Sequence, residues 1–213
     1  MKIKLHKGDL PGTVDLGPLV AVDSETLGLN PVRDRLCLVQ LSAGDGICHA
    51  IQFAPESYAA PNLKKMLVDP KVTKMFHFAR FDVAMFQRYL GVTTAPIYCT
   101  KIASKLVRTY TDKHGLKDLV KELLSVDLSK EQQSSDWGAP ELSEKQLAYA
   151  ANDVAYLHRL KRCSMACWRA NTARRWRRPV STSCLPVPNW TSQGGTASTF
   201  SNTESRVVAI GGS

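Results

Sequence analysis

Leu19-Val-Ala-Val-Asp23-Ser-Glu25-Thr-Leu-Gly-Leu29 is the segment on which both the fold and the chemistry can be argued. Its first four residues form a short apolar run of the kind found in a buried strand, and carboxylates follow. Side chains alternate along a strand, so Asp23 and Glu25 point to the same face. Two hard oxygen ligands side by side suit Mg²⁺ or Mn²⁺. An Asp-x-Glu triplet alone more often marks a solvated strand end, so further residues must support a metal site.

Other strands and helices extend outward from this segment. Strand-like runs cover residues 35–42, 46–53, 74–78 and 95–99, and helical spacing covers residues 62–67, 80–89, 101–107 and 116–124. Ser143 and Gln146 fit a capping box that opens a further long helix, which carries apolar residues as far as Leu160. Strands first, then alternating elements, then helices predict an α/β fold, a mixed five-stranded sheet flanked by helices.

A second acid stands in His77-Phe-Ala-Arg-Phe-Asp82, where a strand gives way to a helix. An acid in the first turn of a helix commonly complements the helix dipole. The apolar neighbours of Asp82 predict a half-buried position, in which an unpaired carboxylate is costly. That cost favours a ligand role.

The late helix carries a third group. Tyr149 and Asp153 are four residues apart and therefore share one helix face. Asp153 borders the apolar stripe of this helix. Two interpretations stay open: a satisfied pair at the edge of the core, or a metal ligand beside a hydroxyl that positions water.

In this combination and order, the motifs resemble the DEDD exonucleases in their tyrosine variant, and within them the ribonuclease D family. The block Gln132-Gln-Ser-Ser-Asp-Trp137 is similar to one that the family carries. Further stretches resemble its compact branch, known as nanoRNase C; they are residues 34–41, 77–82, 99–104 and 109–119. The resemblance covers nearly all of residues 1–161 and implies a ribonuclease H-like (DnaQ-like) fold. Phe78 departs from many ribonuclease D relatives, which have Asn there.

The resemblance implies a metal-dependent 3′-5′ exonuclease that hydrolyses RNA, short oligoribonucleotides above all, to 5′-nucleoside monophosphates. Two Mg²⁺ or Mn²⁺ ions would activate a water and stabilise the leaving oxygen, and Tyr149 would orient that water. The implied metal ligands are Asp23, Glu25, Asp82 and Asp153. Two alternatives remain: a DNA 3′-5′ exonuclease, and a catalytically silent nucleic-acid-binding module. Binding alone does not need four converging acids.

Substrate contacts are predicted beside each motif. The loop Thr26-Leu27-Gly28-Leu29 either holds the terminal base or is a plain loop with an apolar anchor. His77, Phe78 and Arg80 are placed to stack on or neutralise nucleic acid. Trp137 is predicted either to stack a base or to lie in the core. The expected partners are single-stranded RNA or short oligonucleotides, with DNA as the alternative, and the family implies a homo-oligomer.

The last quarter of the chain differs in style. The net charge is +9 over 213 residues, and residues 162–213 hold 7 Lys and Arg against 1 acidic residue. We therefore divide the chain into an exonuclease domain at 1–161 and an atypical basic tail at 162–213, which we expect to be poorly ordered.

The tail also has a second interpretation. Residues 180–195 can be encoded by several sets of synonymous codons. One such set, when it is translated from a frame two bases downstream, gives Phe-Asp-Phe-Leu-Pro-Ala-Arg-Ala-Glu-Leu-Asp-Leu-Ala-Gly-Trp. This alternative translation resembles the family's C-terminus. We therefore interpret the tail as a frameshift product, which puts the homo-oligomer in question. Independent sequencing of the DNA is expected to show a shifted frame; an intact single frame would refute this.

The remaining sequence features concern location. No apolar run approaches the ~20 residues that span a bilayer. The basic N-terminal residues are not followed by the apolar stretch of a signal peptide. A cytoplasmic protein without membrane association is the expectation.

Overall fold

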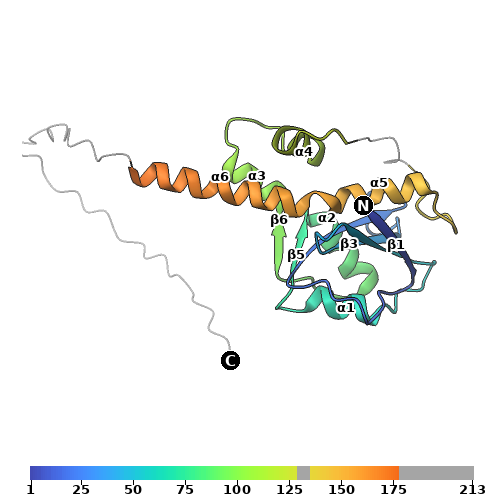
Figure 1. Ribbon diagram of the computed structural model, residues 1–213. Coiled ribbons are helices and arrows are strands. Elements are labelled where there is room, and N and C mark those ends of the chain that lie inside the picture. Colours follow the sequence, from blue (N-terminus) through green and yellow to red (C-terminus); the bar gives the residue numbers. More distant parts are fainter. Residues whose placement is uncertain (129–134, 178–213) are drawn as a thin grey trace, which may run out of the picture. The chain divides into compact units, whose positions relative to one another are not determined.

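The computed structural model describes residues 1–128 and 135–177, and its centre is a six-stranded sheet (Figure 1). The strand order is β1-β4-β3-β2-β5-β6. The strands are β1 (Lys2–Lys7), β2 (Leu19–Thr26), β3 (Leu36–Ser42), β4 (Ile47–Gln52), β5 (Thr73–Phe76) and β6 (Ile97–Cys99). β3 pairs antiparallel with β2 and β4, and the other neighbours are parallel. The predicted mixed sheet flanked by helices is confirmed.

The prediction of five strands was wrong by one. β1 forms the sixth strand and runs parallel to β4 at the edge of the sheet, with Ile3 beside Cys48. Its sequence Lys-Ile-Lys-Leu-His-Lys alternates polar and apolar residues, the period of a half-exposed strand. The alternation was present in the sequence. The strand was not predicted because most of it is exposed and it lacks the long apolar run that marks the inner strands. Lysines along an edge strand also discourage pairing with another chain.

Helices cover the sheet on both sides. They are α1 (Pro61–Val68), α2 (Arg80–Met85), the π-helical turn η1 (Phe86–Leu90), α3 (Thr100–Val107), α4 (Leu116–Leu124), α5 (Glu144–Ala155) and α6 (Leu157–Arg177). The predicted capping box of α5 is confirmed: the Gln146 N–H donates to Ser143 Oγ at 3.3 Å, and the Ser143 N–H donates to Gln146 Oε1 at 3.0 Å. The single helix predicted over residues 80–89 is instead α2 followed by η1, which ends at Gly91 with φ 70°.

Alternate side chains of β2 pack into two separate cores, one on each face of the sheet. Val20 and Val22 pack on one side with residues of α1, α2 and η1. Ala21 packs on the other side with residues of α4, α5 and α6. Because Asp23 and Glu25 continue the alternation of Ala21, they enter the layer between the sheet and α5. Figure 1 shows this layer, with α5 and α6 crossing one face of the sheet and α1 lying on the opposite face.

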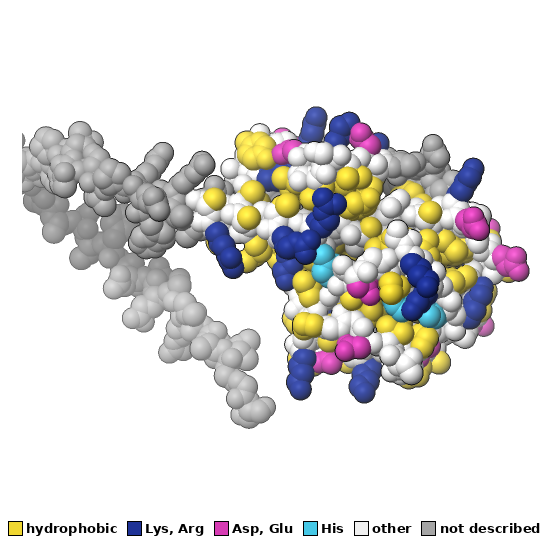
Figure 2. All heavy atoms as spheres, viewed as in Figure 1, with side chains coloured by type: hydrophobic (Ala, Val, Ile, Leu, Met, Phe, Trp, Pro, Cys, Tyr) yellow, Lys and Arg dark blue, Asp and Glu magenta, His cyan; other side chains and the backbone are white. Residues whose placement is uncertain are grey.

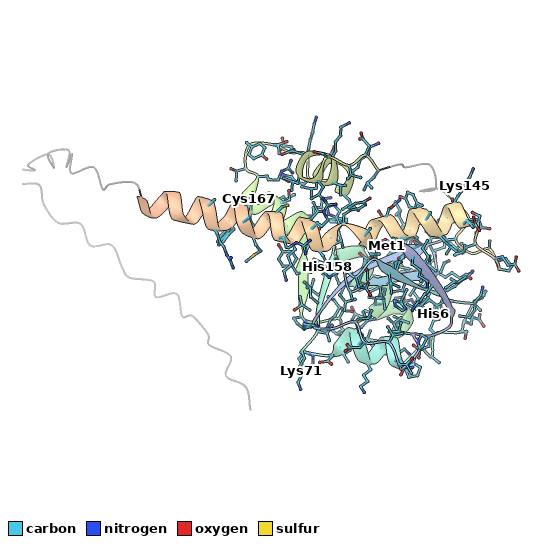
Figure 3. All side chains as sticks on the ribbon, viewed as in Figure 1. Met1, His6, Lys71, Lys145, His158 and Cys167 are labelled. Carbon is cyan, nitrogen blue, oxygen red and sulfur yellow. The ribbon has the colours of Figure 1, made fainter. Side chains whose placement is uncertain are left out.

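The long C-terminal helix is divided rather than continuous. α5 ends at Ala155 and α6 begins at Leu157, so the predicted single helix has a break at Tyr156. His158 fixes the start of α6 over the sheet, where its Nε2 lies 3.1 Å from the Leu19 carbonyl oxygen (Figure 3). α6 continues to Arg177, so the boundary predicted near residue 161 falls inside a helix. Residues 178–213 of the predicted tail lie outside the described residues.

α6 is also a basic helix, because its sequence contains Lys and Arg residues and no Asp or Glu. Figure 2 shows Lys and Arg side chains gathered along the described part of this helix. None of the helices in the described ranges combines the length and the apolar character that crossing a bilayer requires.

Candidate active site

Three carboxylates meet where β2 ends beneath α5. Asp23 and Glu25 come from β2, and Asp153 comes from the third turn of α5. One carboxylate oxygen from each lies within 4.8 Å of the other two. All three side chains are partly exposed. The structure thus brings together two motifs that stand about 130 residues apart in the chain.

Asp82 approaches the same place from α2. It is 4% exposed, and Ser24 Oγ donates a hydrogen bond to its Oδ1 at 2.6 Å. Ser24 lies between Asp23 and Glu25 on β2, so this bond ties the start of α2 to the strand that carries both acids. Asp82 is outside the set of three whose oxygens lie within 4.8 Å, but its charge acts on all of them.

Burial raises the pKa of all four acids, and repulsion between carboxylates adds to it for Asp23, Glu25 and Asp153. Burial, followed by the charges of Asp82, Asp153 and Glu25, raises the pKa of Asp23 well above its usual range. Burial, with Asp153 and Asp82, raises the pKa of Glu25 to about 9. Burial also raises the pKa of Asp82 to about 7, although its bond from Ser24 opposes this, and burial with the charge of Asp82 raises that of Asp153 to about 7.

The donor set fits a divalent cation. Four carboxylates converge, and within the described ranges none of them forms an ion pair with Lys, Arg or His. Like charges at this separation need a compensating positive charge to ionise together. Carboxylate oxygens are the ligands that Mg²⁺ and Mn²⁺ prefer. Asp23, Glu25 and Asp153, with Asp82 behind them, are therefore suited to hold such ions.

Mg²⁺ is expected to raise the melting temperature, and to raise it more at high pH than at low pH. The folded-state pKa values of the carboxyls exceed their unfolded values, so protonation stabilises the metal-free fold fully below about pH 4. That stability is lost as the pH rises through about 7 for Asp82 and Asp153 and about 9 for Glu25. A bound Mg²⁺ would supply the positive charge that compensates for the loss of those protons. Thermal unfolding with Mg²⁺ or with EDTA, between about pH 6 and pH 9, measures the effect; a melting temperature indifferent to Mg²⁺ would refute the cluster.

Tyr149 lies one helical turn before Asp153, on the same face of α5. Burial, followed by the negative charges of Asp153, Glu25 and Asp23, raises the pKa of its phenol. The hydroxyl therefore stays protonated at neutral pH and is available as a hydrogen-bond donor. Its ring packs against Trp137, with centroids 6.1 Å apart and planes at 39°. Trp137 is 2% exposed and belongs to a core cluster with Leu38, and it also lines the cavity formed by these groups, so both predicted interpretations remain open.

Asp23, Glu25, Tyr149 and Asp153 line a cavity of about 580 Å³. All four residues of the predicted base-holding loop, Thr26, Leu27, Gly28 and Leu29, contribute to its wall, as does His77. Two apolar residues of the wall, Phe81 and Leu116, were not predicted from the sequence. Phe81 directly precedes Asp82, so its place in the motif could have indicated it. Leu116 comes from α4, and only the tertiary fold brings it here.

Of the three substrate contacts predicted around the second motif, the structure places only His77 in the wall of this cavity. His77 lines the cavity, with its Nδ1 2.9 Å from Thr100 Oγ1; burial and nearby Lys101 lower its pKa to about 4. His77 is therefore neutral at physiological pH. Phe78 and Arg80 are not among the residues that line the cavity. Phe78 has φ 70° and is half exposed, and Lys101 Nζ lies 4.1 Å from its ring centroid.

Gly28, in the cavity wall, allows the backbone of the loop to lie close to the Asp34 carboxylate. A Cβ at this position would lie 2.3 Å from Asp34 Oδ2. Asp34 has little freedom to withdraw, because it is 6% exposed and its carboxylate accepts the Asn30 N–H at 2.9 Å and an Arg33 N–H at 2.6 Å. Any side chain at residue 28 must therefore displace the loop.

Gly28→Ala is expected to raise KM for an oligonucleotide about tenfold or more, because the loop moves away from the cavity. Binding of Mg²⁺ is expected to stay unchanged, since no metal-ligating side chain is altered. Gly12→Ala is the matched control, because its Cβ would meet its nearest neighbour, Asn62 Oδ1, at an ordinary 3.6 Å. Equal KM values for the two variants would show that the loop does not contact substrate.

Comparison with known proteins agrees with this geometry. Residues 12–163, which include all four acids and Tyr149, match the family described as 3′-5′ exonuclease. The chain belongs to the 3′-5′ exonuclease family. Its ribonuclease H-like fold is shared with ribonuclease D of Escherichia coli, which is 29% identical with a TM-score of 0.64 over 73% of this chain and 41% of that one.

Other known proteins are more similar in sequence than this ribonuclease D. Brucella melitensis NrnC bound to pGG is 51% identical, with a TM-score of 0.77 over 83% of this chain and 86% of that one. NrnC with bound Mg²⁺ is 50% identical, with the same TM-score and coverage. Ribonuclease D of Gluconacetobacter diazotrophicus is 38% identical over 152 residues, or 70% of this chain. The chain spans only 38% of the length of that ribonuclease D.

Proposed function

We propose that this chain is a metal-dependent 3′-5′ exoribonuclease that releases 5′-nucleoside monophosphates from short oligoribonucleotides. The observation that carries the proposal is the convergence of Asp23, Glu25, Asp153 and Tyr149 at one cavity, with Asp82 held beside them by Ser24. The family supports the reaction class. Relatives named ribonuclease D support RNA as the substrate, and the NrnC structure bound to pGG supports a short one.

The four acids would hold two Mg²⁺ or Mn²⁺ ions, as the NrnC structure with bound Mg²⁺ supports for the magnesium. When bound, such ions supply positive charge that lowers the pKa of water and neutralises the charge developing on a phosphodiester. The chain's own contribution is to fix the ligands. β2 orients Asp23 and Glu25, α5 holds Asp153 above them, and the Ser24 hydrogen bond keeps Asp82 in place.

Tyr149 contributes a neutral hydroxyl beside Asp153. Packing against the buried ring of Trp137 restricts the orientation of the phenol. A protonated phenol can donate to the scissile phosphate and accept from the attacking water. We assign Tyr149 the role of holding that water in line with the phosphorus.

The cavity wall would hold the 3′-terminal nucleotide. Leu27 is 50% exposed in the wall and offers an apolar surface against a base. Thr26 Oγ1 donates to the Gly28 carbonyl oxygen at 2.5 Å, which braces the turn beneath it. A volume of about 580 Å³ lies within the range of small-ligand sites and suits the end of an oligonucleotide.

Two alternatives remain distinct proposals. A DNA exonuclease would use the same acids, and the choice depends on contacts to the 2′-hydroxyl that only a bound substrate would reveal. A silent nucleic-acid-binding module is disfavoured, because burying four like-charged groups is costly without a metal to use them. Assembly into a homo-oligomer is carried over from the family as part of the proposal.

Product analysis tests the proposed reaction. The full chain is incubated with Mg²⁺ and an unlabelled oligoribonucleotide, its DNA counterpart, or an oligoribonucleotide blocked by a 3′-phosphate. We expect 5′-monophosphates from the RNA, slower release from the DNA, and protection by the 3′-phosphate. Release of 3′-monophosphates, or equal cleavage of the blocked RNA, would contradict the proposal; faster release from DNA would favour the DNA alternative.

A further inference from the structure

A buried glutamine next to the acids lacks hydrogen-bond partners. Gln40 lies in the middle of β3 and is 0% exposed. Within residues 1–128 and 135–177, neither its Nε2 nor its Oε1 has a hydrogen-bond partner. A buried amide left without partners costs about 1–3 kcal/mol. Such a group calls for a role that compensates for the cost.

The register of the sheet places Gln40 directly beside Asp23. The two residues are cross-strand neighbours in the antiparallel pair of β3 and β2. Cross-strand neighbours project to the same face with Cβ atoms about 5 Å apart. A glutamine amide is long enough to reach a neighbouring carboxylate at that separation. The Asp23 carboxylate has a backbone hydrogen bond from Ser24, and no side-chain donor among the described residues.

We propose that Gln40 is a positioning residue for the metal site, and that its amide N–H₂ donates to the Asp23 carboxylate when Asp23 binds a divalent ion. This inference rests on the proposed function, because it requires the acids to bind metal. A carboxylate that binds an ion through one oxygen lone pair has further lone pairs, and these accept hydrogen bonds from neighbouring donors. A glutamine supplies that donor without charge, whereas a lysine or arginine at the same position would repel the ion.

A second buried glutamine in the same sheet shows what a purely structural amide looks like. Gln52, on β4, is 6% exposed and fully engaged. Its Nε2 donates to the Ala139 carbonyl oxygen at 2.8 Å, and its Oε1 accepts from Lys7 Nζ at 2.5 Å. Gln52 fastens the loop before α5, and Gln40 fastens nothing of that kind. The two residues form a matched pair for mutation.

Gln40→Met and Gln52→Met separate the two roles. Binding of Mn²⁺ to the full chain is measured from the electron paramagnetic resonance signal of the free ion, and melting temperature is measured in EDTA. We expect Gln40→Met to weaken Mn²⁺ binding about 10–100-fold. Its metal-free melting temperature should stay the same or rise, because two unpartnered polar atoms are removed. Gln52→Met should show the reverse: lower stability and wild-type Mn²⁺ affinity.

Each outcome has a distinct meaning. Wild-type Mn²⁺ affinity in Gln40→Met would overturn the inference and leave the metal site standing. Absence of Mn²⁺ binding by the wild-type chain would overturn the proposed function itself. If Gln40→Met does not fold, Gln40→Asn keeps an amide but shortens it by one carbon, and the same loss of Mn²⁺ affinity is expected from it; wild-type affinity there would equally overturn the inference.

Discussion

Asp153→Ala is expected to lower kcat/KM for an oligoribonucleotide by about a thousandfold or more. Asp153 closes the group of three carboxylates from the helix side, and its oxygen lies within 4.8 Å of those of Asp23 and Glu25. Without it, α5 contributes no carboxylate ligand, and an ion held by the remaining acids is expected to lose its fixed position. The fold should not suffer, because the substitution removes one of four mutually repelling acids. We expect an unchanged or higher metal-free melting temperature.

Asp127→Ala is the matched control for this variant. Asp127 is exposed and forms a surface ion pair with Lys121 at 3.1 Å. Such pairs contribute little to stability. Activity of Asp127→Ala should equal that of the wild type. Substantial activity in a folded Asp153→Ala chain would show that the carboxylate cluster is not the catalytic centre.

Tyr149→Phe is expected to reduce kcat about a hundredfold while KM and metal binding change little. The substitution keeps the ring that packs against Trp137 and removes only the hydroxyl. Burial and the neighbouring carboxylates keep that hydroxyl protonated, so the loss should be similar across the neutral pH range. Steady-state kinetics at several pH values measure both quantities.

Tyr110→Phe is the control for removing a phenolic hydroxyl elsewhere. Tyr110 is 72% exposed, and its hydroxyl donates to Glu122 Oε1 at 2.6 Å. Its kinetics should match those of the wild type. If Tyr149→Phe were equally active, water positioning would have to come from another group at the cavity, with neutral His77 as the first candidate.

The parts of the site that could be predicted from sequence depend on short-range geometry. Strand alternation is enough to place Asp23 and Glu25 on one face, and helix spacing is enough to stack Tyr149 over Asp153. The capping box at Ser143 is equally local. That these pieces share one cavity required either the resemblance or the fold, because spacing within a motif says nothing of distances between motifs.

The parts that escaped prediction depend on backbone detail or on register. The expected strand at residues 74–78 ends at Phe76, and the chain turns through a positive φ at Phe78. Neither Phe78 nor Arg80 is among the residues that line the cavity. Gln40 sits in an apolar run, and nothing in the run reveals its neighbour. Only the pairing of β3 with β2 places it beside Asp23.

The most direct test of the account is a time course with a 5′-labelled oligoribonucleotide in the presence of Mg²⁺, Mn²⁺ or EDTA. We predict a ladder of labelled products that shorten one nucleotide at a time from the 3′ end, dependent on the divalent ion and absent with EDTA. Early release of the labelled 5′ nucleotide, internal fragments, or no cleavage by a chain shown to be folded would contradict it.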